Sequence, residues 1–207
     1  MSVPIVTLLL ALLTFVAIAT VVIIVGLFVV SRFAAPARAA LGRLSVEAAS
    51  GGLWVAALVA LVATAGSLYF SEIAHFEPCR LCWFQRIAMY PLAVVLPIAA
   101  WRHDVGVIRY ALPLALIGAP ISVYHYLVEW FPALEGGACD PRNPCSLVWF
   151  REFGFITLPF MALAAFALIA GVLVLARRGR SEAAEVTAAA AHRTDGYRLG
   201  DRDEVMT

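Results

Sequence analysis

Charged side chains are scarce in this sequence. Only 14% of the 207 residues are Asp, Glu, Lys or Arg, while 63% are hydrophobic. A soluble domain is about half apolar and about a quarter charged, so this composition excludes an ordinary soluble protein and indicates a membrane protein. The formal net charge of +1, with no basic patch beyond short loops, argues against a nucleic-acid partner.

The sequence also lacks the motifs that bind the common redox cofactors. It has no Gly-rich dinucleotide fingerprint and no C-x-x-C-H haem motif, and its four histidines are too few for a multi-haem protein. Cysteine is equally rare, but the four copies form two close pairs, Cys79 with Cys82 and Cys139 with Cys145. These pairs are the most informative feature of the chain.

Long apolar stretches predict five membrane-spanning helices. A helix needs about 20 apolar residues to cross the hydrocarbon core of a bilayer. Only the third stretch has a charge well inside it, at Arg86. We therefore expect an all-α integral membrane protein. The predicted spans are 3–31, 51–71, 82–101, 110–128 and 153–176.

The arginines predict the orientation of these spans. Short cytoplasmic loops carry an excess of basic residues. Arginines collect in 32–50, in 102–109 and in the "RRGR" that follows the last span, so these regions should be cytoplasmic. The N-terminus is then outside and the C-terminus inside. The cysteines lie in the two opposite loops, 72–82 and 129–152.

The domain organisation follows from the same pattern. We expect an N-terminal transmembrane helix over 1–31, a cytoplasmic linker over 32–52, a membrane domain over 53–176 and a disordered cytoplasmic tail over 177–207. The first stretch could instead be a signal peptide. It has no basic n-region, however, and its apolar run is about twice the usual length, which favours a retained helix.

Three kinds of site fit the two cysteine pairs in an extracytoplasmic compartment, where disulfides persist. The pairs could be structural disulfides, although a C-x-x-C ring closes too few residues to stabilise much. They could form a four-thiolate metal site, although five residues, two of them proline, separate Cys139 from Cys145. They could pass electrons from one pair to the other, because C-x-x-C thiols often have a lowered pKa and exchange readily. The spacing favours the relay and leaves the other two open.

Arg86 is a charged residue within a predicted membrane span. A charge at this depth costs free energy, so charged residues in membrane spans usually have a function. Arg86 follows Cys82 by four residues, so the two share a helix face, and a helix beginning near Cys82 would also favour a Cys82 thiolate through its dipole. Arg86 could also contact a carbonyl oxygen of a lipid-soluble acceptor, or simply snorkel to the headgroups.

A quinone dissolved in the membrane is an acceptor that needs no sequence motif. It requires an apolar niche with one or two polar contacts, which the outer ends of the second to fourth spans could provide. His125, in "SVYHYLVEW", should lie at a depth similar to Arg86. Its simpler interpretation is an interfacial histidine among aromatic residues.

The string "PCRLCWFQRIAMYP", followed by "YHYLVEWFP" and a second cysteine pair, resembles the disulfide-bond formation protein B (DsbB) family, in its BdbC-like branch. The resemblance covers about residues 53–176. It implies a four-helix transmembrane bundle in a bacterial cytoplasmic membrane, to which this chain adds the helix over 1–31. It also implies reoxidation of a DsbA-like thioredoxin-fold oxidase, with the electrons passed to ubiquinone or menaquinone.

Carried over by motif, the resemblance assigns a role to each cysteine. Cys79 and Cys82 match the quinone-proximal pair, with Cys82 contacting the quinone ring. Cys139 and Cys145 match the loop pair that meets the partner, and Cys139 would form the mixed disulfide.

Two further side chains take cofactor-binding roles by the same resemblance. Arg86 would lie beside the quinone. His125 matches, more loosely, a family histidine near the quinone. To meet the C-x-x-C the loop pair must bend back, and Gly136–Gly137 would make that easier.

Two other functions compete with this one. A vitamin K epoxide reductase-like enzyme uses a similar relay, but in that family the loop pair precedes the C-x-x-C, whereas here the C-x-x-C comes first. A non-enzymatic membrane protein that holds a metal with four thiolates would bind zinc or copper and would not depend on quinone.

Overall fold

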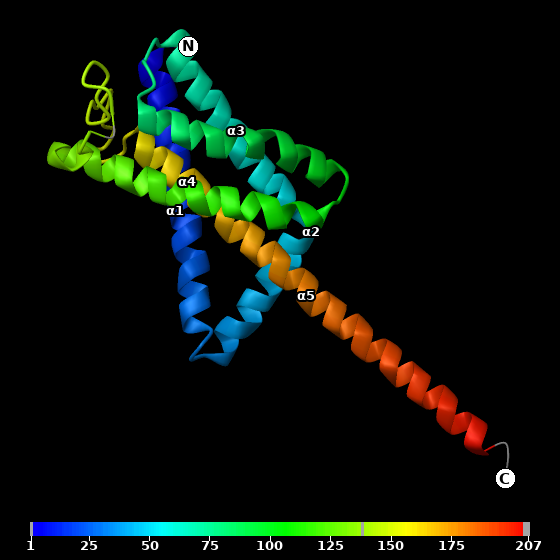
Figure 1. Cartoon of the computed structure of the whole chain (residues 1–207). Helices are drawn as coiled ribbons and strands as arrows, with labels where there is room; N and C mark the ends of the chain where they lie inside the picture. The colour runs from blue at the N-terminus through cyan, green and yellow to red at the C-terminus, as the bar shows by residue number, and fades with distance from the viewer. Residues whose placement is uncertain (1, 138, 205–207) are drawn as a thin grey trace.

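The computed structural model describes residues 2–137 and 139–204 (Figure 1). Within these residues every long element is a helix, and the only β-type pairings are two isolated bridges. Five helices are long and apolar enough to cross a membrane. The prediction of an all-α membrane protein is therefore confirmed. The helices are α1 (Val3–Val30), α2 (Ala35–Leu68), α3 (Arg80–Trp101), α4 (Ile108–Trp130) and α5 (Leu158–Glu204), with the short helices η1 (Tyr69–Ile73), η2 (Val105–Val107) and η3 (Pro132–Glu135) between them.

Helices α2 to α5 form a four-helix bundle. Each of them packs against two neighbours, since α2 and α4 both contact α3 and α5. Small residues at the contacts let the helices approach closely, which is how helices associate in a membrane. Gly118 of α4, for example, lies under the Phe166 ring of α5, and a Cβ there would overlap the ring. The core contains many alanines, among them Ala56, Ala60, Ala88, Ala111, Ala115 and Ala165.

Helix α1 lies outside this bundle and packs against α2 and α5 (Figure 1). It is apolar on all sides, so it has no polar face to turn to water. Leu10 approaches α2 so closely at Gly66 that a Cβ on this glycine would be 2.9 Å from the Leu10 Cδ1 atom. The five predicted spans are thus four bundle helices plus one added helix.

The segment predicted as a linker over 32–52 is mostly helical. Helix α2 begins at Ala35, with Pro36 in its first turn, where proline is readily accepted. Gly51 and Gly52 do not interrupt the helix. Gly52 instead faces α5, where a Cβ would lie 3.1 Å from Val172. The glycine pair thus lies within α2, and Gly52 serves helix packing.

The C-terminal segment also differs from the prediction. Helix α5 begins at Leu158, five residues later than expected, and continues to Glu204 where the sequence predicts a disordered tail (Figure 1). The alanine-rich stretch 183–191 explains the continuation, because alanine has the highest helix propensity. Residues 205–207 of the predicted tail lie outside the described residues.

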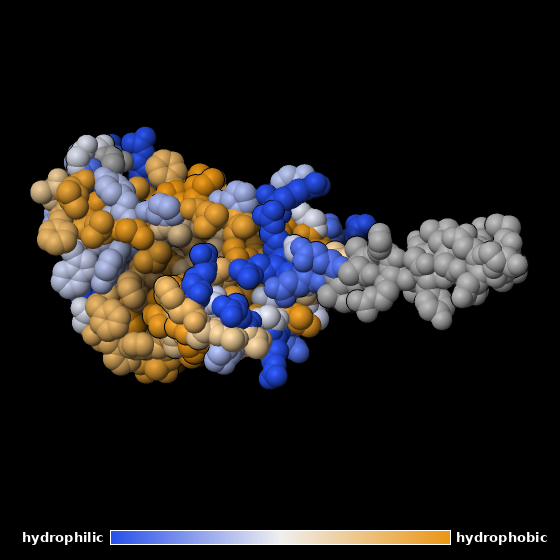
Figure 2. All heavy atoms as spheres, turned by 90° about the horizontal axis from the view of Figure 1, so that it is seen from below, coloured by the Kyte–Doolittle hydropathy of each residue, from blue (hydrophilic) through white to orange (hydrophobic). Residues whose placement is uncertain are grey.

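Hydrophilic side chains collect at one end of the molecule. Figure 2 shows them around the point where α5 leaves the bundle, while hydrophobic residues cover much of the rest of this face. Exposed arginines lie in the α1–α2 turn and the first turns of α2, between α3 and α4 and at the start of α4, and after the apolar part of α5. Because successive helices alternate in direction, the cysteine loops lie at the opposite end. These exposed arginines are Arg32, Arg38, Arg43, Arg102, Arg109, Arg177, Arg178 and Arg180.

Candidate thiol-disulfide site

The C-x-x-C motif forms the beginning of α3. Cys79 is the N-cap residue, with an extended backbone, and its Sγ accepts a hydrogen bond from the Cys82 backbone N–H at 3.4 Å. The two sulfurs are hydrogen-bonded at 3.2 Å. The sequence predicts that a helix beginning near Cys82 would stabilise a thiolate at Cys82. The helix begins at Arg80, so its positive end acts on Cys79 instead.

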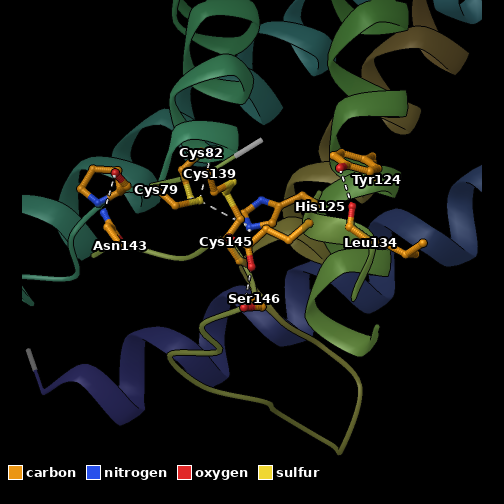
Figure 3. Close-up of a disulfide and its surroundings, with 11 residues drawn as sticks. Cys79, Cys82, Tyr124, His125, Leu134, Cys139, Asn143, Cys145 and Ser146 are labelled. Atoms are coloured by element: carbon orange, nitrogen blue, oxygen red, sulfur yellow. Dashed lines mark hydrogen bonds between the residues drawn. A yellow bond between two sulfur atoms is a disulfide. The ribbon is translucent and has the colours of Figure 1, made fainter. Parts of the chain in front are cut away.

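His125 of α4 lies between the two cysteine pairs. Its Nε2 atom is 3.6 Å from the Cys79 Sγ and 3.2 Å from the Cys145 carbonyl oxygen. The side chain is buried, and its Nδ1 atom has no hydrogen-bond partner among the described residues. Figure 3 shows the imidazole beside the four cysteines. Its polar contacts are therefore with the thiol-disulfide centre.

These contacts decide which thiol ionises first. The hydrogen bond with the Cys82 thiol, together with the nearby His125, lowers the pKa of the Cys79 thiol to about 4, even though burial acts in the opposite direction. A thiol with this pKa is a thiolate at neutral pH, and the thiolate is the form that attacks disulfides. Cys79 is the thiolate of the C-x-x-C pair.

The loop pair is oxidised and packs directly on the C-x-x-C. Cys139 and Cys145 form a disulfide. Both are buried in one small cluster with Cys79, Leu81 and Val128, and Cys82 packs against its edge. The two cysteine pairs, which are more than 50 residues apart in the sequence, therefore form a single centre (Figure 3).

Hydrogen bonds fix the loop in this position. The Glu135 carboxylate accepts from the Cys145 backbone N–H and from the Ser146 hydroxyl, both at 2.9 Å. The Asn143 amide donates to the Pro78 carbonyl oxygen at 3.3 Å, which joins the loop to the residue before Cys79. These bonds leave the loop disulfide little freedom to move away from the C-x-x-C.

The bend before Cys139 uses the glycines that the sequence singled out. Gly136 and Gly137 have φ angles of 52° and 76°, in the left-handed region that other residues rarely adopt. The chain turns back at this point, immediately after η3. The expectation that these two glycines help the loop to bend is confirmed.

Arg86 makes its polar contacts with α2. Its Nε donates to the Ser67 hydroxyl and its Nη2 to the Ser67 carbonyl oxygen, each at 3.0 Å. The guanidinium carbon also lies 5.2 Å from the Trp83 ring and 5.9 Å from the Tyr90 ring, within the range of cation–π contacts. Two of its five N–H donors are used by Ser67, so the group is held in place and keeps donors free.

A cavity of about 320 Å³ opens beside this arginine. Cys82 and Arg86 both line it, as does Gln85 between them, and most of the remaining lining is apolar. Cys82 is the only one of the four cysteines that lines this cavity. The volume and the few polar groups match those of a small-molecule site.

His125 does not line this cavity, although the resemblance places it near the acceptor. No residue of α4 belongs to the lining within the part of the chain that the structure describes. The physical reason is that α4 borders the other side of the α3 N-terminus, where the loop pair packs. The structure therefore brings Arg86 and Cys82 to one cavity and His125 to Cys79.

Comparison with known proteins identifies the family. The family model described as "Disulfide bond formation protein DsbB" matches residues 49–176, more than half of the chain. The chain belongs to the DsbB family. It is therefore a multi-pass membrane protein of disulfide bond formation, with the role of a thiol oxidoreductase.

Several curated relatives of this DsbB-family chain carry the same kind of name. It is 50% identical over 131 residues to "Disulfide bond formation protein C" of Bacillus subtilis, a match covering 63% of this chain and 95% of that protein. It is 45% identical over 126 residues to a "Probable disulfide formation protein" of Coxiella burnetii, covering 60% and 86%. It is 51% identical over 111 residues to "Probable disulfide formation protein C 1" of Bacillus anthracis, covering 53% and 79%. No solved structure matches the chain.

The metal-site alternative finds limited support in this DsbB-family centre. Among the described residues, two groups of three potential ligands have their ligand atoms within 4.8 Å of one another. The first joins Cys79 and Cys82 to His125, and the second joins Cys139 and Cys145 to Glu135. Neither group holds all four cysteines, and the sulfurs of the second are joined in a disulfide.

Sequence reasoning missed three residues at the DsbB-family site. Ser67 holds Arg86, but it is 19 residues away on another helix. Glu135 holds the Cys145 loop, and its place just before Gly136–Gly137 was the only signal for it. Glu129, four residues after His125, is a buried carboxylate whose Oε2 atom has no partner among the described residues.

Proposed function

We propose that this protein is a membrane thiol:quinone oxidoreductase. It reoxidises a DsbA-like thioredoxin-fold oxidase and passes the electrons to ubiquinone or menaquinone. The observation that carries the proposal is the order of contacts. The loop disulfide packs against Cys79, Cys79 is hydrogen-bonded to Cys82, and Cys82 opens into an apolar cavity with an arginine.

The first exchange takes place at the loop pair. A thiolate of the partner attacks Cys139, the bond between Cys139 and Cys145 breaks, and a mixed disulfide forms between Cys139 and the partner. The second thiol of the partner then attacks the partner sulfur in the mixed disulfide, and Cys139 is released as a thiolate. The partner has lost two electrons and two protons, and the loop pair is a dithiol. Cys139 is 8% exposed and Cys145 1%, which supports Cys139 as the sulfur attacked.

The second exchange joins the two pairs. Starting from an oxidised Cys79–Cys82 pair, the Cys145 thiolate attacks Cys79 and Cys82 leaves as a thiolate. Cys139 then attacks Cys145, which restores the loop disulfide and releases Cys79. His125 supports this order, because its Nε2 contacts the Cys79 sulfur and the Cys145 carbonyl together. The structure, with a loop disulfide and a C-x-x-C dithiol, corresponds to the state after this exchange.

In the last step the C-x-x-C dithiol becomes a disulfide again. Its two electrons and two protons convert the quinone substrate to quinol. Cys82 faces the cavity and Arg86 has donors left for a carbonyl oxygen, so these two side chains would hold the quinone ring. His125 acts on Cys79 in this scheme and does not contact the ring.

The proposal includes an orientation and a domain scheme. Both cysteine pairs are extracytoplasmic, the C-terminus is cytoplasmic, and the membrane is the bacterial cytoplasmic membrane. Exposed arginines at the end opposite the cysteines support this orientation. Residues 53–176 are the catalytic membrane domain, residues 1–31 the added helix and residues 177–207 a cytoplasmic extension.

The test is quinone reduction by the purified protein, supplied with a reduced thioredoxin-fold oxidase and either ubiquinone or menaquinone. We expect quinol to form with the wild type and not with Cys82→Ser. If neither quinone is reduced and the wild type instead copurifies with zinc or copper, the four-thiolate metal-binding function replaces this proposal.

A further inference from the structure

The lining of the cavity beside Cys82 is polar at one end and apolar along the rest. Its polar groups lie at the α3 end, where Cys82, Gln85 and Arg86 meet the connection that carries Glu77. Away from this end its walls come from α1, α2 and α5 and are apolar. The site is therefore shaped for an amphipathic ligand, with a polar ring at one end and a hydrocarbon chain along the rest. The apolar lining of α2 and α5 includes Leu58, Val59, Val62, Met161, Ala165 and Leu168.

Helix α1 forms one of these walls. Its lining residues run from Leu10 to Ala17, which on an α-helix covers about 10 Å. They offer no free polar group, since the Thr14 hydroxyl donates to the Leu10 carbonyl oxygen at 2.8 Å. The α1 wall is therefore suited to contact with a hydrocarbon chain and offers no hydrogen bond to a polar ligand. The lining residues of α1 are Leu10, Leu13, Thr14, Val16 and Ala17.

Direct contacts fix α1 relative to the site. Leu10 packs onto Gly66 of α2, next to the Ser67 that holds Arg86. The Phe15 ring packs edge-to-face on Phe153 at 5.2 Å and on Phe155 at 5.9 Å, in the connection that leads into α5. Helix α1 nevertheless lies outside residues 49–176, which match the family.

From these contacts we infer that α1 is part of the substrate site and binds the isoprenoid tail of the quinone. The inference rests on the proposed function, because it takes the Cys82 end of the cavity as the place of the quinone ring. The tail then lies between α1 and the α2–α5 face of the bundle. The added helix makes this protein selective for quinones with a tail.

The first test fills the cavity from α1. Ala17→Trp places a large ring in the tail region, while Ala19→Trp, two residues away on an exposed part of the same helix, is the matched control. Each variant is assayed with menaquinone and with menadione, the same ring without an isoprenoid tail. Ubiquinone and its tail-less benzoquinone ring are assayed in parallel. The loss of a few methylene contacts should raise the KM of Ala17→Trp for the tailed quinones about tenfold.

The two substrates separate the possible results. We expect the KM for the tail-less quinones to change little in Ala17→Trp, and Ala19→Trp to behave as the wild type with both. Equal KM values for Ala17→Trp and the wild type with tailed quinones would overturn the role of α1 and leave the proposed function standing. Failure of the wild type to reduce any quinone would remove the proposed function, and this inference with it.

A second test detects binding without turnover. A photoreactive benzoylphenylalanine replaces Leu13, which lines the cavity, or Leu12, which does not. After illumination with bound menaquinone or ubiquinone, mass spectrometry should find the quinone attached at position 13 and not at position 12. Attachment of phospholipid acyl chains at position 13 in the presence of quinone would show that membrane lipid occupies this wall, and would overturn the inference.

Discussion

The Cys79 sulfur is stabilised by a helix end, a thiol and an imidazole at the same time. It accepts a backbone N–H at the start of α3, it is hydrogen-bonded to Cys82, and His125 Nε2 lies 3.6 Å away. All three interactions favour the thiolate. Cys82 faces the cavity and has no comparable set of partners. In the proposed exchange the two sulfurs of the motif thus have different tasks: Cys79 is attacked and then leaves as a stabilised thiolate, and Cys82 faces the electron acceptor.

The lowered pKa of Cys79 predicts an unusual pH dependence. In a Cys139→Ala, Cys145→Ala background with the C-x-x-C reduced, a thiolate should persist as the pH falls from about 8 to about 5, since an ordinary thiol has a pKa of about 8.5. It should be lost only as the pH approaches the Cys79 pKa of about 4. Ultraviolet thiolate absorbance measures this. His125→Ala should move the loss to higher pH, and an unchanged profile in that variant would contradict the role of His125.

The loop pair yields a trapping prediction. With the oxidised partner, Cys145→Ala should accumulate a disulfide between Cys139 and the partner. The Cys139 thiolate attacks the partner disulfide and one partner thiol leaves, and Cys145, which would otherwise attack Cys139 and release the partner, is gone. Non-reducing electrophoresis after mixing with the partner measures it. Trapping by Cys139→Ala, with none by Cys145→Ala, would reverse the assignment within the pair.

Arg86→Lys should weaken the use of quinone. Lysine carries a point charge and cannot reproduce the fork that bonds both the hydroxyl and the carbonyl of Ser67. We expect a KM for quinone about tenfold higher, equivalent to about 1.4 kcal/mol, with exchange between the partner and the loop pair unchanged. Ser67→Ala removes only the hydroxyl and should have a smaller effect. If Arg86→Lys shows an unchanged dependence on quinone concentration, Arg86 does not contact the quinone.

Residue types and spacing were enough to select the cysteines and Arg86 from the sequence. The residues that hydrogen-bond to these side chains could not be predicted in this way. Ser67 contacts Arg86 across two helices, and nothing in a serine within an apolar stretch predicts that contact. The place of the Cys79 thiolate also depended on the first residue of α3. Because α3 begins at Arg80, two residues before Cys82, its positive end lies at Cys79 and not at Cys82.

At the scale of elements, hydropathy predicted the spans well, because a stretch long enough to cross a bilayer is unmistakable in composition. It failed at both ends of the bundle. The linker predicted over 32–52 is mostly helical, and Gly52 makes room there for Val172. The tail predicted to be disordered continues α5, because its alanine-rich stretch favours a helix. Packing and propensity decide such segments, and hydropathy measures neither.

Gly179 gives a test of the packing between α2 and α5. A Cβ at this position would overlap the backbone carbonyl of Ser45, which cannot move aside as a side chain could. Gly179→Ala should therefore destabilise the protein by about 1–3 kcal/mol. Gly51→Ala, where no atom lies within 4 Å of the new Cβ, is the matched control and should cost nothing. Thermal unfolding in detergent measures both, and equal melting temperatures would show that the crossing is looser than described.

At the scale of the whole molecule, the two ends carry different chemistry. The cysteine centre occupies one end and most of the exposed arginines the other, although Arg80, Arg142 and Arg151 are exposed at the cysteine end. The positive-inside rule predicts that a cysteine at Arg180, in a background without native cysteines, is protected from a membrane-impermeant maleimide in intact cells. A cysteine at Ala133, in η3, should react. The reverse pattern would invert the proposed orientation.

The burial of the cysteine centre also determines which thiols can react with it. Cys79, Cys139 and Cys145 are each less than 10% exposed, and Cys82 opens toward hydrocarbon. A small soluble thiol finds almost no sulfur surface to attack, whereas a protein surface that fits the loop can reach Cys139. Under the proposed function, small free thiols therefore transfer few electrons to the quinone, and the membrane oxidant is reserved for the protein partner that fits the loop.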